Sequence, residues 1–101
     1  MEIRTKTSGN TVEVALSGRL DTNTAPALTE ALNQAVTDEV EAVIFDFAEL
    51  SYISSAGLRV ILQMQKKMNA RQGSMTVRHP NDIIWEVFEA TGFTEIMQIE
   101  R

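Results

Sequence analysis

Two adjacent hydroxyl side chains, Ser54 and Ser55, are the residues of this sequence best placed to carry chemistry. They follow an apolar run typical of a buried strand, residues 42–47, and precede a helical pattern from Ala56 to about Arg71. A serine at a helix start can cap the helix, because its oxygen accepts a hydrogen bond from an unpaired backbone N–H. The positive end of the helix dipole also tolerates a negative charge there. The pair is therefore either a structural cap or a phosphorylation site.

A phosphate at this turn would add roughly two negative charges at pH 7. Because the helix dipole accommodates such a charge, we expect the fold to survive the modification. The surface would change instead, since a protein packed over the turn would meet a bulky dianion. The pattern thus indicates a binding switch rather than an unfolding switch.

Other chemistries lack the residues they need. A serine nucleophile requires a base, and the only histidine, His79, sits beside Pro80 and is interpreted as a surface residue. The order Ser-Ser-Ala-Gly lacks the first glycine of a nucleophile elbow, and no glycine-rich phosphate loop is present. Asp21, Asp46 and Glu49 are too dispersed to suggest a metal site. We therefore expect no enzyme, metal or cofactor.

The composition indicates a single domain, residues 1–101, whose apolar fraction of 44% supports a real core. The absence of cysteine and of a signal-peptide pattern favours a cytoplasmic protein. A formal net charge of −5 disfavours both nucleic acid and direct binding to an anionic membrane. A protein partner is the favoured ligand class.

The first half of the chain predicts a hairpin followed by a helix. Residues 2–8 form an edge strand, Gly9-Asn10 a turn, and residues 11–17 an alternating strand, which is followed by a strand end and turn at residues 18–21. A helix begins around Pro26 and ends near residues 37–38, with an apolar stripe at helical spacing.

The second half predicts a buried central strand at 42–47, a connection at 48–51, and the helix 56–71. A strand at 75–79 and a helix opening at residues 80–82 follow, with Gly92 just past its end. Residues 94–99 form a short strand or a second short helix. Trp85 and Phe88 are predicted to be core residues. The order predicts an α/β domain of two layers, a mixed sheet with its helices on one face.

Three segments together resemble the STAS domain, the family of bacterial anti-sigma factor antagonists that also occurs in sulfate transporters. They are Gly18-Arg19-Leu20-Asp21 after a strand, Asp46-Phe47 at the end of the central strand, and residues 52–62. The resemblance covers essentially the whole chain, including Thr91-Gly92-Phe93. It implies a two-layer STAS fold, a mixed sheet with helices packed on one face.

The resemblance also implies partner switching. An unphosphorylated antagonist binds an anti-sigma factor, a serine kinase of the histidine-kinase-like ATPase fold, and thereby releases the sigma factor for transcription. The kinase phosphorylates the antagonist and detaches it, and a PP2C-type phosphatase restores the active form. STAS-like proteins also dock on the ATPase of ABC-type lipid transport complexes, which is the alternative function.

The family motif, usually Asp-Ser-Ser/Thr-Gly, is phosphorylated on the first hydroxyl residue after the aspartate. Aligning Gly57 with the motif glycine implies phosphorylation at Ser55, with Ser54 as the less favoured acceptor; Ser54 occupies the place of the motif aspartate. Asp21 matches the family's aspartate near this site. The residues that the resemblance implies for partner binding are Asp21, Thr24, Ser54, Ser55, Ala56, Gly57, Leu58 and Arg59.

Several of these residues have a structural alternative. Asp21 either forms an Asx-turn with the backbone N–H groups of the residues that follow it or contributes to the partner surface. Leu58 and Tyr52 are either core or partner-facing. Arg59 is either solvated or paired with a partner carboxylate. Gly57 is expected to let the helix start approach the sheet closely.

Overall fold

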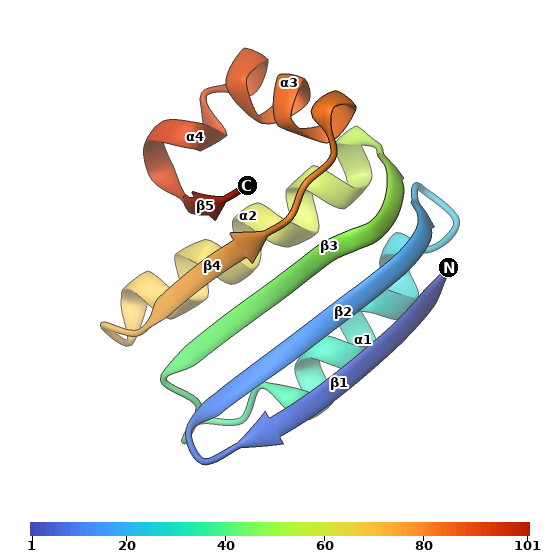
Figure 1. The fold of residues 1–101 in the computed structure, drawn as a ribbon. Helices are drawn as coiled ribbons and strands as arrows, with labels where there is room; N and C mark the ends of the chain where they lie inside the picture. The colour runs from blue at the N-terminus through green and yellow to red at the C-terminus, as the bar shows by residue number, and fades with distance from the viewer.

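The computed structural model describes residues 1–101 as a five-stranded sheet with helices between its strands (Figure 1). The strands lie in the order β1-β2-β3-β4-β5; β1 is antiparallel to β2, and the other neighbours are parallel. The elements are β1 (Glu2–Ser8), β2 (Thr11–Leu20), α1 (Ala25–Ala35), β3 (Ala42–Ile53), α2 (Ser55–Ala70), β4 (Ser74–Arg78), α3 (Asp82–Thr91), α4 (Phe93–Ile96) and β5 (Gln98–Glu100).

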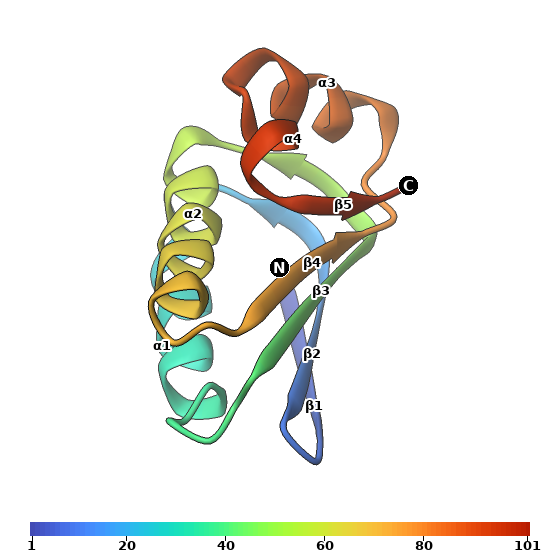
Figure 2. The same ribbon diagram turned by 90° about the vertical axis from the view of Figure 1, so that its left-hand side faces the viewer.

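The helices α1 and α2 lie side by side against one face of the sheet, as Figure 2 shows. They connect β2 to β3 and β3 to β4, which are parallel neighbours and so require crossover connections. The helix α3 packs near the end of β3, and the short helix α4 lies next to β5, the edge strand that follows it (Figure 1). The predicted mixed sheet with a helical layer is confirmed. No helix is long and apolar enough to span a bilayer.

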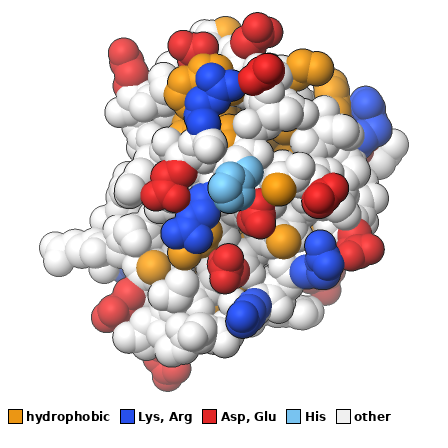
Figure 3. Space-filling model, viewed as in Figure 1, with side chains coloured by type: hydrophobic (Ala, Val, Ile, Leu, Met, Phe, Trp, Pro, Cys, Tyr) orange, Lys and Arg blue, Asp and Glu red, His pale blue; other side chains and the backbone are white.

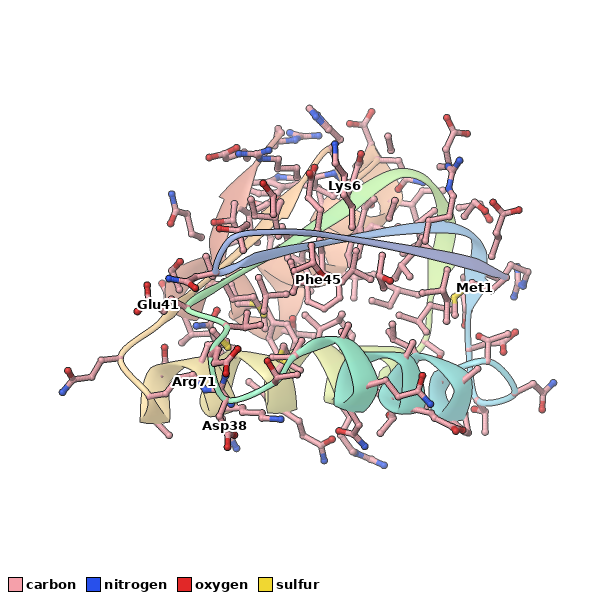
Figure 4. All side chains as sticks on the ribbon, turned by 90° about the horizontal axis from the view of Figure 1, so that it is seen from below. Met1, Lys6, Asp38, Glu41, Phe45 and Arg71 are labelled. Carbon is pink, nitrogen blue, oxygen red and sulfur yellow. The ribbon has the colours of Figure 1, made fainter.

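The core lies between the sheet and this helical layer. Figure 4 shows Phe45 between the strands and the helices, whereas Lys6 points the opposite way. Burying a side chain such as Phe45 contributes about 2–3 kcal/mol. The opposite face of the sheet carries interspersed acidic and basic side chains (Figure 3). The alternating buried residues of the two central strands are Val12, Val14, Leu16, Val43, Phe45 and Phe47.

The two central strands are longer than predicted. β2 continues through Leu20, and β3 continues through Ile53, so residues 48–51 are strand rather than a connection. The extension is held by pairing such as Leu20 with Ile53, after register shifts near Ala15 and Gly18. These irregularities break the two-residue alternation from which the strand ends were predicted, because a bulge moves side chains to the other face.

The last third of the chain contains both structures that were alternatives for residues 94–99, since α4 is followed by β5. Phe88 is fully buried between Phe47 and Phe93, with ring centroids 6.2 and 6.0 Å away. The prediction that Trp85 is a core residue is wrong. Its ring is half-buried beneath the Arg101 guanidinium, which lies 4.7 Å from the ring centroid.

Smaller differences concern helix and strand ends. α1 ends at Ala35, where the N–H of Val36 donates to the Leu32 carbonyl and the chain turns away. α2 begins one residue earlier than predicted and ends at Ala70, and β4 runs from Ser74 to Arg78. Gly92 adopts a left-handed conformation (φ 80°) just past α3, as predicted for a residue that terminates a helix.

Candidate functional site

Ser54 is the N-cap of α2. Its backbone is extended, and its Oγ accepts a hydrogen bond from the N–H of Gly57 at 3.3 Å. Its own N–H donates to the carbonyl of Leu20 at 2.9 Å, which ties the start of the helix to the end of β2. The side chain is half-buried. Both the hydroxyl and the backbone N–H of Ser54 therefore serve to hold the start of α2 in place.

Ser55 is the first residue of α2, and its environment differs from that of its neighbour. It is exposed, and its hydroxyl makes no hydrogen bond within the protein. The two roles that the sequence left open thus fall on different residues: Ser54 caps the helix, and Ser55 presents an unengaged hydroxyl. Ser55 as the phosphorylated residue stays a prediction, and its exposure meets the steric requirement for modification.

Gly57 lets α2 approach the sheet. A Cβ atom at this position would lie 2.6 Å from Leu20 Cγ, a distance that real Cβ atoms essentially never show. It would also lie 3.1 Å from Ile53 Cγ1, which is tighter than most real contacts. Leu20 and Ile53 are paired across β2 and β3 and are buried. The glycine therefore sets how deeply the first turn of α2, and with it Ser55, sits against the ends of two strands.

Asp21 forms the predicted Asx-turn at the end of β2. Its Oδ1 accepts hydrogen bonds from the backbone N–H groups of Asn23 (2.9 Å) and Thr24 (3.1 Å) and from the Thr24 hydroxyl (3.2 Å). Partial desolvation raises the pKa of Asp21, but these hydrogen bonds and the nearby charge of Arg19 outweigh it, so that the pKa is lowered overall. The carboxylate is thus ionised at neutral pH and shapes the turn before α1.

Arg19 and Tyr52 form a pair that the sequence patterns did not predict. The two residues are opposite each other in the parallel β2–β3 ladder, and the Arg19 guanidinium carbon lies 4.1 Å from the Tyr52 ring centroid. Arg19 Nε is also 3.9 Å from Asp21 Oδ2. Tyr52 is 37% exposed, so the pair belongs to the surface. Only the strand register brings them together, because they are far apart in sequence.

The other predicted partner-binding residues divide between surface and core. Leu58 is only 9% exposed and packs in the core, which is the first of its two predicted roles. Gly57 is buried, and Ala56 is half-buried against the core. Thr24 is half-buried, and its one hydroxyl hydrogen is shared between the Arg19 carbonyl at 2.9 Å and Asp21 Oδ1. Arg59 is exposed on the first turns of α2.

Five of the exposed or half-exposed residues lie where β2 and β3 end and α2 begins, and we call this group the Ser55 surface; its members are Arg19, Asp21, Tyr52, Ser55 and Arg59. None of them lines any of the three surface hollows, which lie between α1 and α2, over the open sheet face and along β1. No group of three or more His, Cys, Asp or Glu side chains converges anywhere in the protein. A surface without a hollow is suited to contact with another protein rather than to enclosing a small molecule.

Comparison with known proteins gave consistent results. The family model of the STAS domain matches residues 2–101. The anti-sigma-B factor antagonist of Listeria monocytogenes is 30% identical over 89 residues, which cover 88% of this chain and 78% of that protein.

Solved structures show the same fold. An anti-sigma factor antagonist from Mycobacterium paratuberculosis superposes with a TM-score of 0.87 at 22% identity, covering 98% of this chain and 84% of that one. The Bacillus cell fate determinant SpoIIAA in its phosphorylated form superposes with a TM-score of 0.79 at 22% identity, covering 97% and 90%.

Proposed function

The chain belongs to the STAS domain family, and we propose that it acts in the cytoplasm as an anti-sigma factor antagonist switched by phosphorylation of Ser55. The observation that carries the proposal is the unengaged, exposed hydroxyl of Ser55 beside the capping Ser54. The name of the Listeria relative, an anti-sigma-B factor antagonist, supports the choice of partner class. The protein acts by binding rather than by catalysis.

The partner is an anti-sigma factor that is also a serine kinase of the histidine-kinase-like ATPase fold. In the modification step the Ser55 Oγ gives its proton to a base of the kinase and attacks the γ-phosphorus of ATP. The bond between that phosphorus and the bridging oxygen of ADP breaks, so that phosphoserine and ADP are formed. A PP2C-type phosphatase returns the serine by hydrolysis, with inorganic phosphate as the second product.

The location of Ser55 explains how a phosphate would weaken binding without unfolding the domain. The side chain is exposed, so the added group displaces no core residue. The first turn of α2 carries no acidic residue that would repel it. A partner packed against the Ser55 surface would instead have to desolvate a dianion, which is costly unless it supplies matching cations.

The test is phosphorylation of the purified protein by its cognate anti-sigma kinase with ATP, followed by mass spectrometry. One phosphate is expected, on Ser55, and Ser55→Ala should abolish both its addition and the ATP-dependent release of the partner. Ser8→Ala, which removes an exposed serine on β1, is the matched control and should change neither result. A phosphate mapped to another residue, or none with an active kinase, would overturn the proposal.

A further inference from the structure

Arg59 differs from every other arginine of the protein. Of the six arginines in the sequence, the other five are held by a carboxylate, a backbone carbonyl or an aromatic ring. Arg59 is exposed and has no hydrogen bond, ion pair or ring contact. A guanidinium group whose N–H donors find no acceptor within the protein is free to bind an added anion.

The sequence of α2 explains why Arg59 lacks a partner. The helix contains sixteen residues and none of them is acidic, although the chain carries fourteen Asp and Glu residues and a net charge of −5. On a helix, the nearest side-chain neighbours of a residue are those three or four positions before and after it. For Arg59 these positions hold Ser55, Ala56, Leu62 and Gln63, so no carboxylate is available.

Ser55 and Arg59 are four residues apart on this helix, and both are exposed. This spacing places their Cβ atoms on one face, about 5–6 Å apart. The order, with the anionic position on the N-terminal side of the cation, is the favourable orientation for such a pair. A phosphate on Ser55 would therefore lie within reach of the only arginine that is free to receive it.

We propose that Arg59 binds the phosphate of phosphorylated Ser55, so that the modified protein carries its own counter-ion. The inference rests on Ser55 being the modified residue, as proposed above. Binding by Arg59 holds the phosphate along α2 and at the same time withdraws the guanidinium from any carboxylate of a partner. Phosphorylation of Ser55 would thereby change both Ser55 and Arg59 as contact residues for a partner.

Arg19 is the other arginine of this surface, and it is not equivalent to Arg59. Its guanidinium already lies over Tyr52 at 4.1 Å and faces Asp21 at 3.9 Å. Moving it to a phosphate would give up both contacts, whereas Arg59 gives up none. Substitution of Arg59 is therefore expected to have the larger effect on the phosphate.

The test installs phosphoserine at position 55 during synthesis of the full chain, so that no kinase is needed. A phosphorus NMR titration then follows the second ionisation of the phosphate in the wild type and in Arg59→Gln. We expect the ionisation constant to be about twofold smaller in the variant, the size of an i,i+4 ion pair. The difference should disappear in 1 M salt, since the pair is exposed to screening.

Lys66→Gln is the matched control. Lys66 is exposed on the same helix, eleven residues from Ser55, or about 16 Å along the axis. Its substitution should leave the phosphate titration unchanged, and Arg59→Lys should restore part of the wild-type value. Equal titrations in the wild type and Arg59→Gln, or an equal change in Lys66→Gln, would overturn the inference. A kinase that modifies a different residue would overturn the proposed function but leave this result standing.

Discussion

The backbone N–H of Ser54 donates a hydrogen bond to the carbonyl oxygen of Leu20, 2.9 Å away. This bond joins the last residue of β2 to the residue that caps α2, and the Leu20 side chain packs where a Cβ of Gly57 would lie. The end of β2 and the start of α2 are thus joined by a hydrogen bond and by close packing. The connection brings the chain at Asp21, which follows Leu20, close to the chain at Ser55, which follows Ser54.

The two serines should respond differently to substitution by alanine. Ser54→Ala removes the cap that accepts the Gly57 N–H, and we expect it to lower the free energy of unfolding by about 1 kcal/mol. Ser55→Ala removes a hydroxyl without a partner and should change stability by less than about 0.5 kcal/mol. Urea unfolding of both variants measures the contrast. A larger loss in Ser55→Ala would show that its hydroxyl has a structural role.

Gly57→Ala should destabilise the protein although alanine is the better helix former. The added Cβ would meet Leu20 Cγ at 2.6 Å, and Leu20 is fully buried and cannot move aside freely. We expect a loss of about 1–3 kcal/mol, which exceeds the gain of up to about 1 kcal/mol in helix propensity. In the double variant with Leu20→Ala the two losses should be less than additive. Strict additivity in denaturant unfolding would argue against this contact.

Asp21 should contribute stability that depends on pH. Because hydrogen bonds and Arg19 lower its pKa in the folded state, the ionised carboxylate is favoured by folding. The contribution is fully present above the ordinary aspartate pKa of about 3.9 and is lost as the pH falls through the lower folded-state value. Asp21→Asn should therefore be less stable than the wild type at pH 7.

The difference between the wild type and Asp21→Asn should close below the folded-state pKa of Asp21. Unfolding by urea at a series of pH values from 7 down to below that pKa measures this trend. The asparagine side chain keeps an oxygen acceptor for the turn, so the comparison isolates the charge. A difference that widens on acidification would contradict the lowered pKa.

Phe88 and Trp85 should contribute unequally to stability despite their similar size and neighbouring positions on α3. Phe88 is fully buried beside Phe47, and Phe88→Ala is expected to cost about 3–5 kcal/mol. Trp85 is half-buried under Arg101, so Trp85→Ala should cost clearly less. Thermal unfolding of the two variants measures the order, and equal losses would mean that Trp85 belongs to the core after all.

Local patterns in the sequence were sufficient for the type and order of almost every element. The hairpin turn at Gly9, the amphipathic helices and the buried run at 42–47 depend on periodicity and turn residues that act within a few positions. The serine pair at the helix start was likewise visible from the order of residues, whereas the choice of Ser55 and of Asp21 came from the resemblance to the STAS family. These features are encoded locally, so neighbouring residues suffice to predict them.

Contacts between distant residues decided the rest. The extension of β3 to Ile53 depends on a ladder with β2 that contains register shifts, and the pairing of Arg19 with Tyr52 depends on the same register. The burial of Phe88 rather than Trp85 depends on where α3 packs. Which serine caps α2 was settled by the geometry of its first turn, where Ser54 alone is aligned with the Gly57 N–H. Such choices are made by packing and strand register, and periodicity within one segment carries no information about either.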